Sequence, residues 1–96
     1  MADWTEKEKR IIWEKGEIVS GYDENVWRKD QCGAFIKWDK YGDRSSQENY
    51  GWEIDHIKPE SKGGEDITSN ARPLQWYNNV KRSNGKLTCP VIAKEE

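Results

Sequence analysis

Apolar and polar residues near the start of the chain follow the pattern of an amphipathic helix. Thr5 and Glu8 have the spacing of a capping box, in which the threonine accepts from the amide three positions on and the glutamate reaches back. Gly16 is a residue type at which helices commonly end. Residues 11–13 are apolar, whereas Glu and Lys occupy most of the remaining positions. We therefore predict a peripheral helix over about 6–15 with one face in solvent.

Two stretches of alternating apolar and polar residues predict two strands. Residues 32–38 and 50–57 both alternate, which suits short strands with one buried face. The connection at 41–46 is rich in turn-forming residues, so we predict that the two strands pair as an antiparallel hairpin. Residues 18–30 carry Gly, Asp and Asn, and we predict that they are mostly loop.

The last part of the chain combines a loop with a second helix. Residues 60–69 contain Gly63 and Gly64 and a single apolar side chain, which predicts a surface loop. Apolar residues recur at helical spacing over 73–83, and Gly85 is suited to end that helix. The expected order is helix, strand, strand, loop, helix, which is an α+β fold.

Composition limits the chain to one small domain with an aromatic core. Its 96 residues contain only 15 Leu, Ile, Val and Phe, whereas six Trp and four Tyr supply large buried areas. The net charge of −2 is too small to hold the chain open. No apolar run approaches the roughly 20 residues that cross a bilayer, and the first residues lack the apolar stretch of a signal peptide. We therefore expect a soluble, cytoplasmic protein without a membrane partner.

The two cysteines leave two interpretations open. Cys32 and Cys89 are either buried small apolar residues or the two halves of one bridge. Neither has a second cysteine three residues away, so a zinc site built from four cysteines is excluded.

Charge is distributed unevenly along the chain. Residues 1–66 carry a net charge of −5, whereas residues 67–94 carry +5 and contain no Asp or Glu. This acid-free stretch in an otherwise acidic chain is a candidate anion-binding surface, and a chance imbalance of charge is the alternative.

The only histidine, His56, directly follows Asp55 at the end of the second predicted strand. The second predicted helix carries Asn79. If that helix packs against the hairpin, the carboxylate of Asp55 and the amide oxygen of Asn79 could converge on one cation. His56 would then lie beside the cation as a general base.

These residues resemble the HNH (His-Asn-His) nuclease family, which is built on a ββα-metal motif. The resemblance covers GWEIDHIKPESKGGEDITSNARPLQWYNNVKRSNG at 51–85, and VWRKDQCGAFIKW upstream looks like the first strand of the same module. Thirteen residues separate His56 from Asn70, and eight separate Asn70 from Asn79. The resemblance implies a single domain over 1–96, with an added N-terminal helix and a ββα-metal core at about 32–85.

The resemblance also implies a role for each matching residue. Asp55 and Asn79 match the metal ligands, His56 matches the general base, and Asn70 matches the residue that ties down the loop and holds the histidine. The chain has Asn79 at a position where many family members have His. The predicted ligand atoms are therefore all oxygens, which suits Mg²⁺ or Mn²⁺. We expect no structural zinc, because the two cysteine pairs of many relatives are missing.

Basic residues of the acid-free stretch are the expected DNA contacts. We assign Arg82 to the region of the scissile phosphate and Lys81 to a flanking phosphate, since neighbouring helix positions do not face the same phosphate. Lys86 is a third candidate for DNA binding.

The function implied is a metal-dependent endonuclease that hydrolyses DNA with one divalent ion and a histidine base, leaving 5′-phosphate and 3′-hydroxyl ends. The alternative is a nucleic-acid-binding module that retains the HNH fold without cleavage. Small free-standing relatives often occur near phage packaging proteins, which implies DNA and a targeting protein of that kind as partners. The low number of basic side chains agrees with such targeting.

Overall fold

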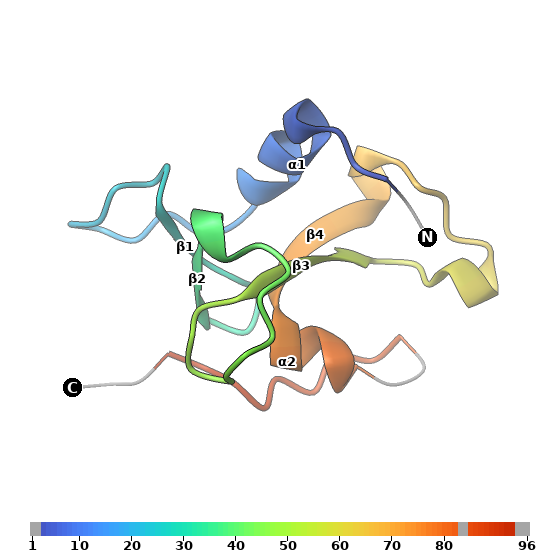
Figure 1. Cartoon of the computed structure of the whole chain (residues 1–96). Coiled ribbons are helices and arrows are strands. Elements are labelled where there is room, and N and C mark those ends of the chain that lie inside the picture. The colour runs from blue at the N-terminus through green and yellow to red at the C-terminus, as the bar shows by residue number, and fades with distance from the viewer. Residues whose placement is uncertain (1–2, 83–84, 94–96) are drawn as a thin grey trace.

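A computed structural model gives the fold for residues 3–82 and 85–93, and it contains two antiparallel hairpins and two helices (Figure 1). The predicted α+β class is confirmed. The elements in chain order are α1 (Glu6–Trp13), β1 (Trp27–Lys29), β2 (Phe35–Lys37), the 3-10 turn η1 (Trp38–Lys40), β3 (Trp52–His56), the 3-10 turns η2 (Glu60–Lys62) and η3 (Thr68–Asn70), β4 (Ala71–Gln75) and α2 (Trp76–Val80).

The first helix begins where the capping box predicts. Thr5 Oγ1 accepts from the amide of Glu8 at 3.1 Å, and Glu8 Oε1 accepts from the amide of Thr5 at 3.0 Å. The helix ends at Trp13, two residues earlier than predicted, and buries Ile12 and Trp13 completely.

Lys15, just after α1, contacts the beginning of β4. Its Nζ donates to the carbonyl oxygen of Ala71 at 2.7 Å and also to that of Thr68. Burial lowers the pKa of Lys15, because desolvation disfavours the charged ammonium. This contact places α1 against the strand that pairs with β3.

The first hairpin pairs β1 with β2, which differs from the prediction. Residues 18–30 are mostly loop, as predicted, but they also contain β1, which the sequence did not indicate. The strand predicted at 32–38 exists at β2, but its partner is β1 rather than the strand predicted at 50–57. Strand β1 has only three residues, so its alternation is too short to distinguish it from loop in the sequence.

A side-chain contact makes the turn that brings β1 and β2 together. Asp30 Oδ1 accepts from the amides of Cys32 and Ala34, both at 2.9 Å. Gly33 lies between them with φ of 84°, a left-handed conformation that glycine adopts without steric cost. The carboxylate of Asp30 therefore supplies the acceptor for two backbone amides of this turn.

The second hairpin pairs β3 with β4, and this corrects a second prediction. Residues 71–75 form a strand, so the helix predicted over 73–83 is wrong at its beginning. Pro73 is compatible with a strand here because β4 is an edge strand of a two-stranded sheet. Asp55 and Arg72 are directly opposite each other in the register, and they form an ion pair.

Helix α2 is shorter than predicted, because the side chain of Gln75 caps its first turn and the helix begins only after that residue. Gln75 Oε1 accepts from the amides of Tyr77 at 2.8 Å and Asn78 at 3.0 Å, which satisfies two free donors of the first turn. The helix ends at Val80. Ser83, the predicted last residue, lies outside the described residues.

The core is aromatic, as the composition predicts. Trp13, Ile36 and Trp52 are completely buried, and Trp38 and Ile54 pack against them. The ring centroids of Trp13 lie 5.1 Å from those of Trp52 and 5.5 Å from those of Trp38. These contacts join α1, the first hairpin and the second hairpin.

A buried carboxylate links the two hairpins to α2. Asp30 is 3% exposed, and its Oδ2 accepts from the amide of Gln75 at 2.9 Å and from Asn78 Nδ2 at 3.1 Å. Together with the two bonds to its own turn, the carboxylate has four hydrogen bonds. The charge is therefore stabilised by donors from both hairpins and the helix.

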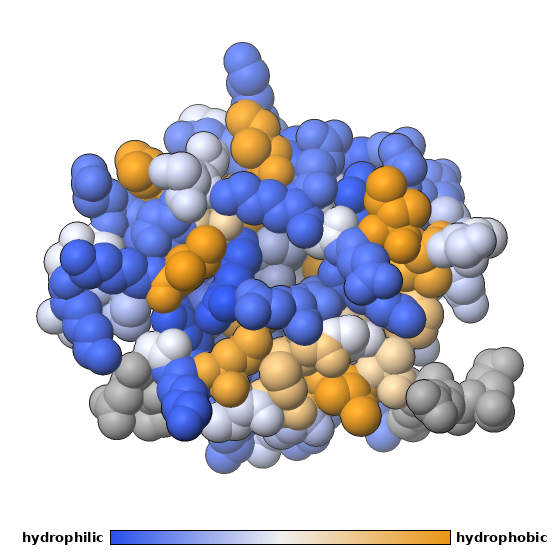
Figure 2. Space-filling view, turned by 180° about the vertical axis from the view of Figure 1, so that it is seen from behind, coloured by the Kyte–Doolittle hydropathy of each residue, from blue (hydrophilic) through white to orange (hydrophobic). Residues whose placement is uncertain are grey.

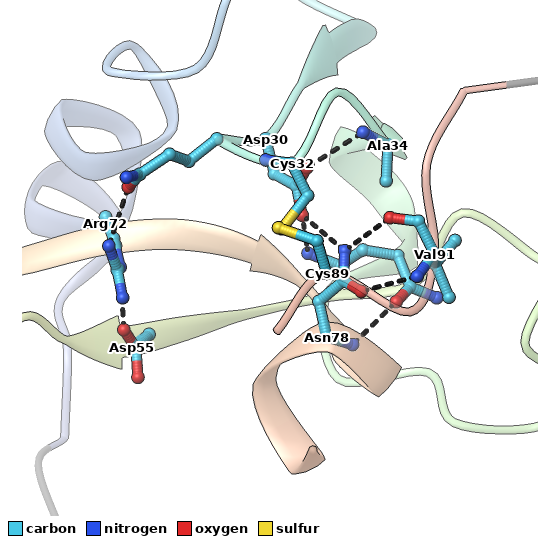
Figure 3. The surroundings of a disulfide bond; sticks show 10 residues. Asp30, Cys32, Ala34, Asp55, Arg72, Asn78, Cys89 and Val91 are labelled. Carbon is cyan, nitrogen blue, oxygen red and sulfur yellow. Dashed lines mark hydrogen bonds and ion pairs between the residues drawn. A yellow bond between two sulfur atoms is a disulfide. The ribbon is translucent and has the colours of Figure 1, made fainter. Parts of the chain in front are cut away.

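The C-terminal segment is attached at the same place (Figure 3). Cys32 and Cys89 form a disulfide, so of the two interpretations the bridge is the one in the structure. It closes a separation of 57 residues, which in the chain-entropy account stabilises the fold by about 4 kcal/mol. Next to it, Asn78 Nδ2 donates to the carbonyl oxygen of Val91 and Asn78 Oδ1 accepts from its amide.

Apolar side chains also remain on the surface of this small domain. Figure 2 shows them in small groups among hydrophilic ones on one face, with a larger group along its lower edge.

Among the described residues, no helix is long and apolar enough to span a bilayer.

We predict that Asp30→Ala lowers the free energy of unfolding by at least about 3 kcal/mol, because it leaves several buried donors without partners. Asp39→Ala is the matched control, since Asp39 is exposed and its one ion pair, to Lys37, has a distance of 4.0 Å. That variant should stay within about 0.5 kcal/mol of the parent. Urea unfolding followed by circular dichroism measures both, and equal stabilities would contradict the role given to Asp30.

Candidate active site

The site lies at the end of β3, where two consecutive residues point to opposite sides. Asp55 is 6% exposed and its carboxylate contacts two arginines: Oδ2 accepts from Arg72 Nε at 2.8 Å, and Oδ1 accepts from Arg82 Nη1 at 2.5 Å. His56 is the next residue and turns toward the connection at 57–70. This opposite placement follows from the period of a strand.

Two carboxylates flank the ring of His56. Its Nε2 lies 2.5 Å from Asp66 Oδ1, and its Nδ1 lies 3.9 Å from Glu60 Oε1. A carboxylate is only an acceptor, so the hydrogen bond to Asp66 requires the proton on Nε2. The indole of Trp4 lies 6.0 Å from the imidazole, centroid to centroid. The imidazole is thus held on one side and leaves Nδ1 without a hydrogen bond among the described residues.

Asn70 closes the connection that follows His56. Its Oδ1 accepts from the amide of Lys58 at 2.9 Å, while its Nδ2 donates to the carbonyl oxygens of Lys58 and Glu65. This is the place at which the resemblance expects a residue that ties down the loop. Gly64 fits only as glycine, because a Cβ there would lie 1.7 Å from the carbonyl oxygen of Lys58.

Asn79 of α2 reaches the same side of the hairpin as Asp55. Its Nδ2 donates to Glu53 Oε1 at 2.9 Å, so its Oδ1 is not used in that bond. Asp55 and Asn79 line one cavity of about 260 Å³, together with Arg82 and four residues from 59–62 and 85. His56 is not among the lining residues. The structure therefore brings the two predicted metal ligands to one cavity, and the predicted base, which directly follows Asp55 in the chain, does not line it.

The predicted DNA contacts differ in how accessible they are. Lys81 and Lys86 are exposed. The side chain of Arg82 is only 7% exposed, and beyond Asp55 its guanidinium donates to the carbonyl oxygens of His56 and Ile57. The donors of Arg82 therefore hold the end of β3 in this structure, and its assignment to the region of the scissile phosphate stays a prediction.

Comparison with protein families matches residues 30–85 of the 96 to the HNH endonuclease family. The chain belongs to this family. Neither the curated proteins nor the solved structures give a match. HNH domains are generally endonucleases that act on DNA, so the match supports a nuclease or nucleic-acid-binding activity.

The HNH family typically uses a divalent metal, and the donor atoms at the cavity suit one. Asp55 offers carboxylate oxygens and Asn79 an amide oxygen, which are ligands that hard divalent cations prefer. A carboxylate can accept about four contacts, and the two arginines use two of them. The site therefore fits a divalent metal in the type of its ligand atoms and in the number of free acceptor positions. Two arginine side chains, however, already neutralise Asp55, the anionic ligand among the described lining residues.

Sequence reasoning missed three residues around the HNH site: Arg72, Glu60 and Asp66. The ligand atoms of His56, Glu60 and Asp66 all lie within 4.8 Å of one another, so this group could also hold a cation. In the sequence, Arg72 is one of the five basic residues of the acid-free stretch at 67–94. Acidic and basic residues are common in loops and strands, so no signal in the sequence distinguishes these three from surface charges.

We predict that Arg82→Ala lowers the free energy of unfolding by about 3–5 kcal/mol, because it removes a buried partner of Asp55 and two backbone contacts. Lys81→Ala is the neighbouring control and should change stability by less than about 0.5 kcal/mol, since Lys81 is exposed. Urea unfolding distinguishes the two residues. A stable Arg82→Ala protein that has only lost DNA affinity would instead support Arg82 as a DNA contact.

Proposed function

We propose that this HNH domain is a metal-dependent endonuclease that hydrolyses DNA phosphodiester bonds with Mg²⁺ or Mn²⁺. The observation that supports it most is the cavity shared by Asp55 and Asn79, which come from β3 and α2 and match the family's metal ligands. His56 follows Asp55 directly and matches the family's general base.

The proposed role of His56 follows from its two neighbours. Because Asp66 accepts from Nε2, the lone pair of the neutral ring lies on Nδ1, which takes the proton from an attacking water. Glu60 Oε1, at 3.9 Å from Nδ1, is beyond hydrogen-bond distance and leaves that atom available. Asn70 keeps the connection at 57–70 closed, which holds Asp66 and His56 on the same side.

A divalent ion bound by Asp55 and Asn79 would polarise the phosphate and stabilise charge on the departing 3′ oxygen. Cleavage of this bond gives 5′-phosphate and 3′-hydroxyl ends. Lys81 and Lys86 are exposed and belong to the acid-free stretch, so we assign them to the DNA backbone.

A nucleic-acid-binding module without cleavage is the second candidate, and one observation favours it. Both oxygens of Asp55 are bonded to arginines, so a divalent ion has to share the carboxylate with two positive charges. If this pairing keeps the ion out, the domain retains the fold and binds nucleic acid only.

We also propose a targeting protein, such as phage packaging machinery, and a cytoplasmic location. The overall net charge of −2 limits the affinity of the domain for DNA, which agrees with targeting by a partner. The disulfide between Cys32 and Cys89 bears on the location, because thiols in the cytosol are usually kept reduced. A cytoplasmic protein should therefore contain these cysteines in the reduced form.

The first test is cleavage of supercoiled plasmid with Mg²⁺, with Mn²⁺ and with EDTA. The parent should nick or cut with either metal and be inactive with EDTA, whereas His56→Ala should lose about 10²- to 10⁴-fold in rate while the metal still raises its melting temperature. Asp55→Asn should lose both cleavage and this metal-dependent stabilisation. A parent protein that binds plasmid but never cuts it would support the binding module instead.

A second test addresses the contact between Asp66 and His56. Asp66→Asn should lower kcat by about 10- to 100-fold with little change in KM, because it disturbs the orientation of the base without removing a substrate contact. Glu60→Gln is the matched control, since it removes a carboxylate on the other side of the ring that has no hydrogen bond to it. Equal kcat values for the two variants would remove Asp66 from the mechanism.

A further inference from the structure

The outward side of the first hairpin carries alternating aromatic and basic residues. Trp27 lies opposite Lys37, and Lys29 lies opposite Phe35. These four side chains share one face, because the residues between them, Arg28 and Ile36, are buried on the other. The hairpin of β1 and β2 lies on the opposite side of the molecule from the connection at 57–70 (Figure 1).

Each lysine of this face lies against an aromatic ring of the facing strand. Lys37 Nζ is 5.5 Å from the ring centroid of Trp27, and Lys29 Nζ is 5.1 Å from that of Phe35. Such contacts keep the ammonium groups at the face instead of extended into solvent. Lys37 also forms a 4.0 Å ion pair with exposed Asp39. The two positive charges are thus placed among rings and stay accessible to an anion.

Two tyrosines extend the face. Tyr22 contacts the rings of both Trp27 and Phe35, at 6.1 Å and 5.7 Å between centroids, and Tyr50 contacts that of Trp27 at 5.0 Å. Tyr22 is 52% exposed and Tyr50 is 43% exposed. About half of each of these residues is therefore in solvent, although the rings are fixed by neighbouring aromatics.

Tyr50 has an unusual backbone conformation. Its φ is 64°, in the left-handed region that costs a bulky residue free energy. The hydrogen bond from Lys37 N to Tyr50 O joins two backbone groups, so any residue at position 50 could make it, and glycine would do so without strain. A large aromatic side chain at this position points to a use of the ring itself.

We propose that Tyr22, Trp27, Lys29, Phe35, Lys37 and Tyr50 form a binding face for an unpaired nucleic-acid strand. The exposed rings of Tyr22 and Tyr50, which Trp27 and Phe35 hold in place, provide surfaces on which bases stack, and this stacking tolerates any sequence. The two lysines provide charges for the phosphates between the stacked bases. A paired duplex cannot use the rings in this way, because its bases are already stacked on one another.

This proposal does not depend on cleavage. Because the face lies away from His56, it would hold nucleotides that flank the candidate active site rather than those at it. Binding is therefore measured in EDTA, and His56→Ala should bind as tightly as the parent. Failure of the cleavage proposal and failure of the binding proposal are therefore measured separately, the first by plasmid cleavage and the second by binding in EDTA.

The experiment is fluorescence anisotropy with a labelled oligothymidylate of about 15 nucleotides, and with its uridylate counterpart to compare DNA with RNA. Tyr22→Ala should weaken binding by about 5- to 150-fold, whereas Tyr22→Phe, which keeps the ring, should bind like the parent. Tyr41→Ala is the matched control, since Tyr41 is 40% exposed and has Lys9 over its ring but lies off the face. It should leave the affinity unchanged, and circular dichroism confirms that each variant is folded.

The lysines are tested by the salt dependence of the same binding. Replacing both Lys29 and Lys37 by Gln should reduce the slope of log affinity against log salt by about 0.7 for each lysine, whereas Lys7→Gln on α1 should not change it. Three outcomes overturn the proposal: equal affinity of Tyr22→Ala and the parent, an equal loss in Tyr41→Ala, or equal binding of an abasic chain of the same length.

Discussion

The carboxylate of Asp30 is the contact on which the arrangement of this domain depends. Its four hydrogen bonds join the turn of the first hairpin to the beginning of α2 and to Asn78, which in turn holds the C-terminal segment. A buried charge with fewer donors would cost several kcal/mol, so the two hairpins and α2 have to keep their relative positions. Because α2 carries Asn79, the same constraint determines where the candidate metal ligand lies.

A second buried carboxylate, Asp55, connects the fold with the chemistry. Arg72 holds it from the neighbouring strand, and Arg82 holds it from the end of α2 while also bonding the backbone after β3. These pairs fix the geometry of the cavity and reduce its attraction for a further cation. If Asp55 is the metal ligand that we propose, stability and metal affinity oppose each other there, and the balance between them distinguishes the two proposed functions.

Part of the fold could be predicted because its signals are local. The capping box at Thr5 defines the beginning of α1, and the alternation before His56 defines β3. Strand pairing was not predictable, because β1 and β2 have three residues each and the turn between them is made by a side chain, Asp30, rather than by a turn sequence. The helix predicted over 73–83 begins too early for a similar reason. Leu74 fits the apolar spacing of a helix and that of a strand, and only its contacts in the folded chain distinguish the two.

The family and the residues proposed for the site follow from the chain alone, because the spacing of Asp55, His56, Asn70 and Asn79 is a property of the sequence. Which charged side chains pair with one another depends on the tertiary fold. Arg82 reads as a DNA contact in the sequence but lies buried against Asp55, and Asp66 reads as a loop residue but accepts from His56. The physical reason is that a side chain's partners across the fold determine its solvation and its charge balance, and neither is encoded in its neighbours along the chain.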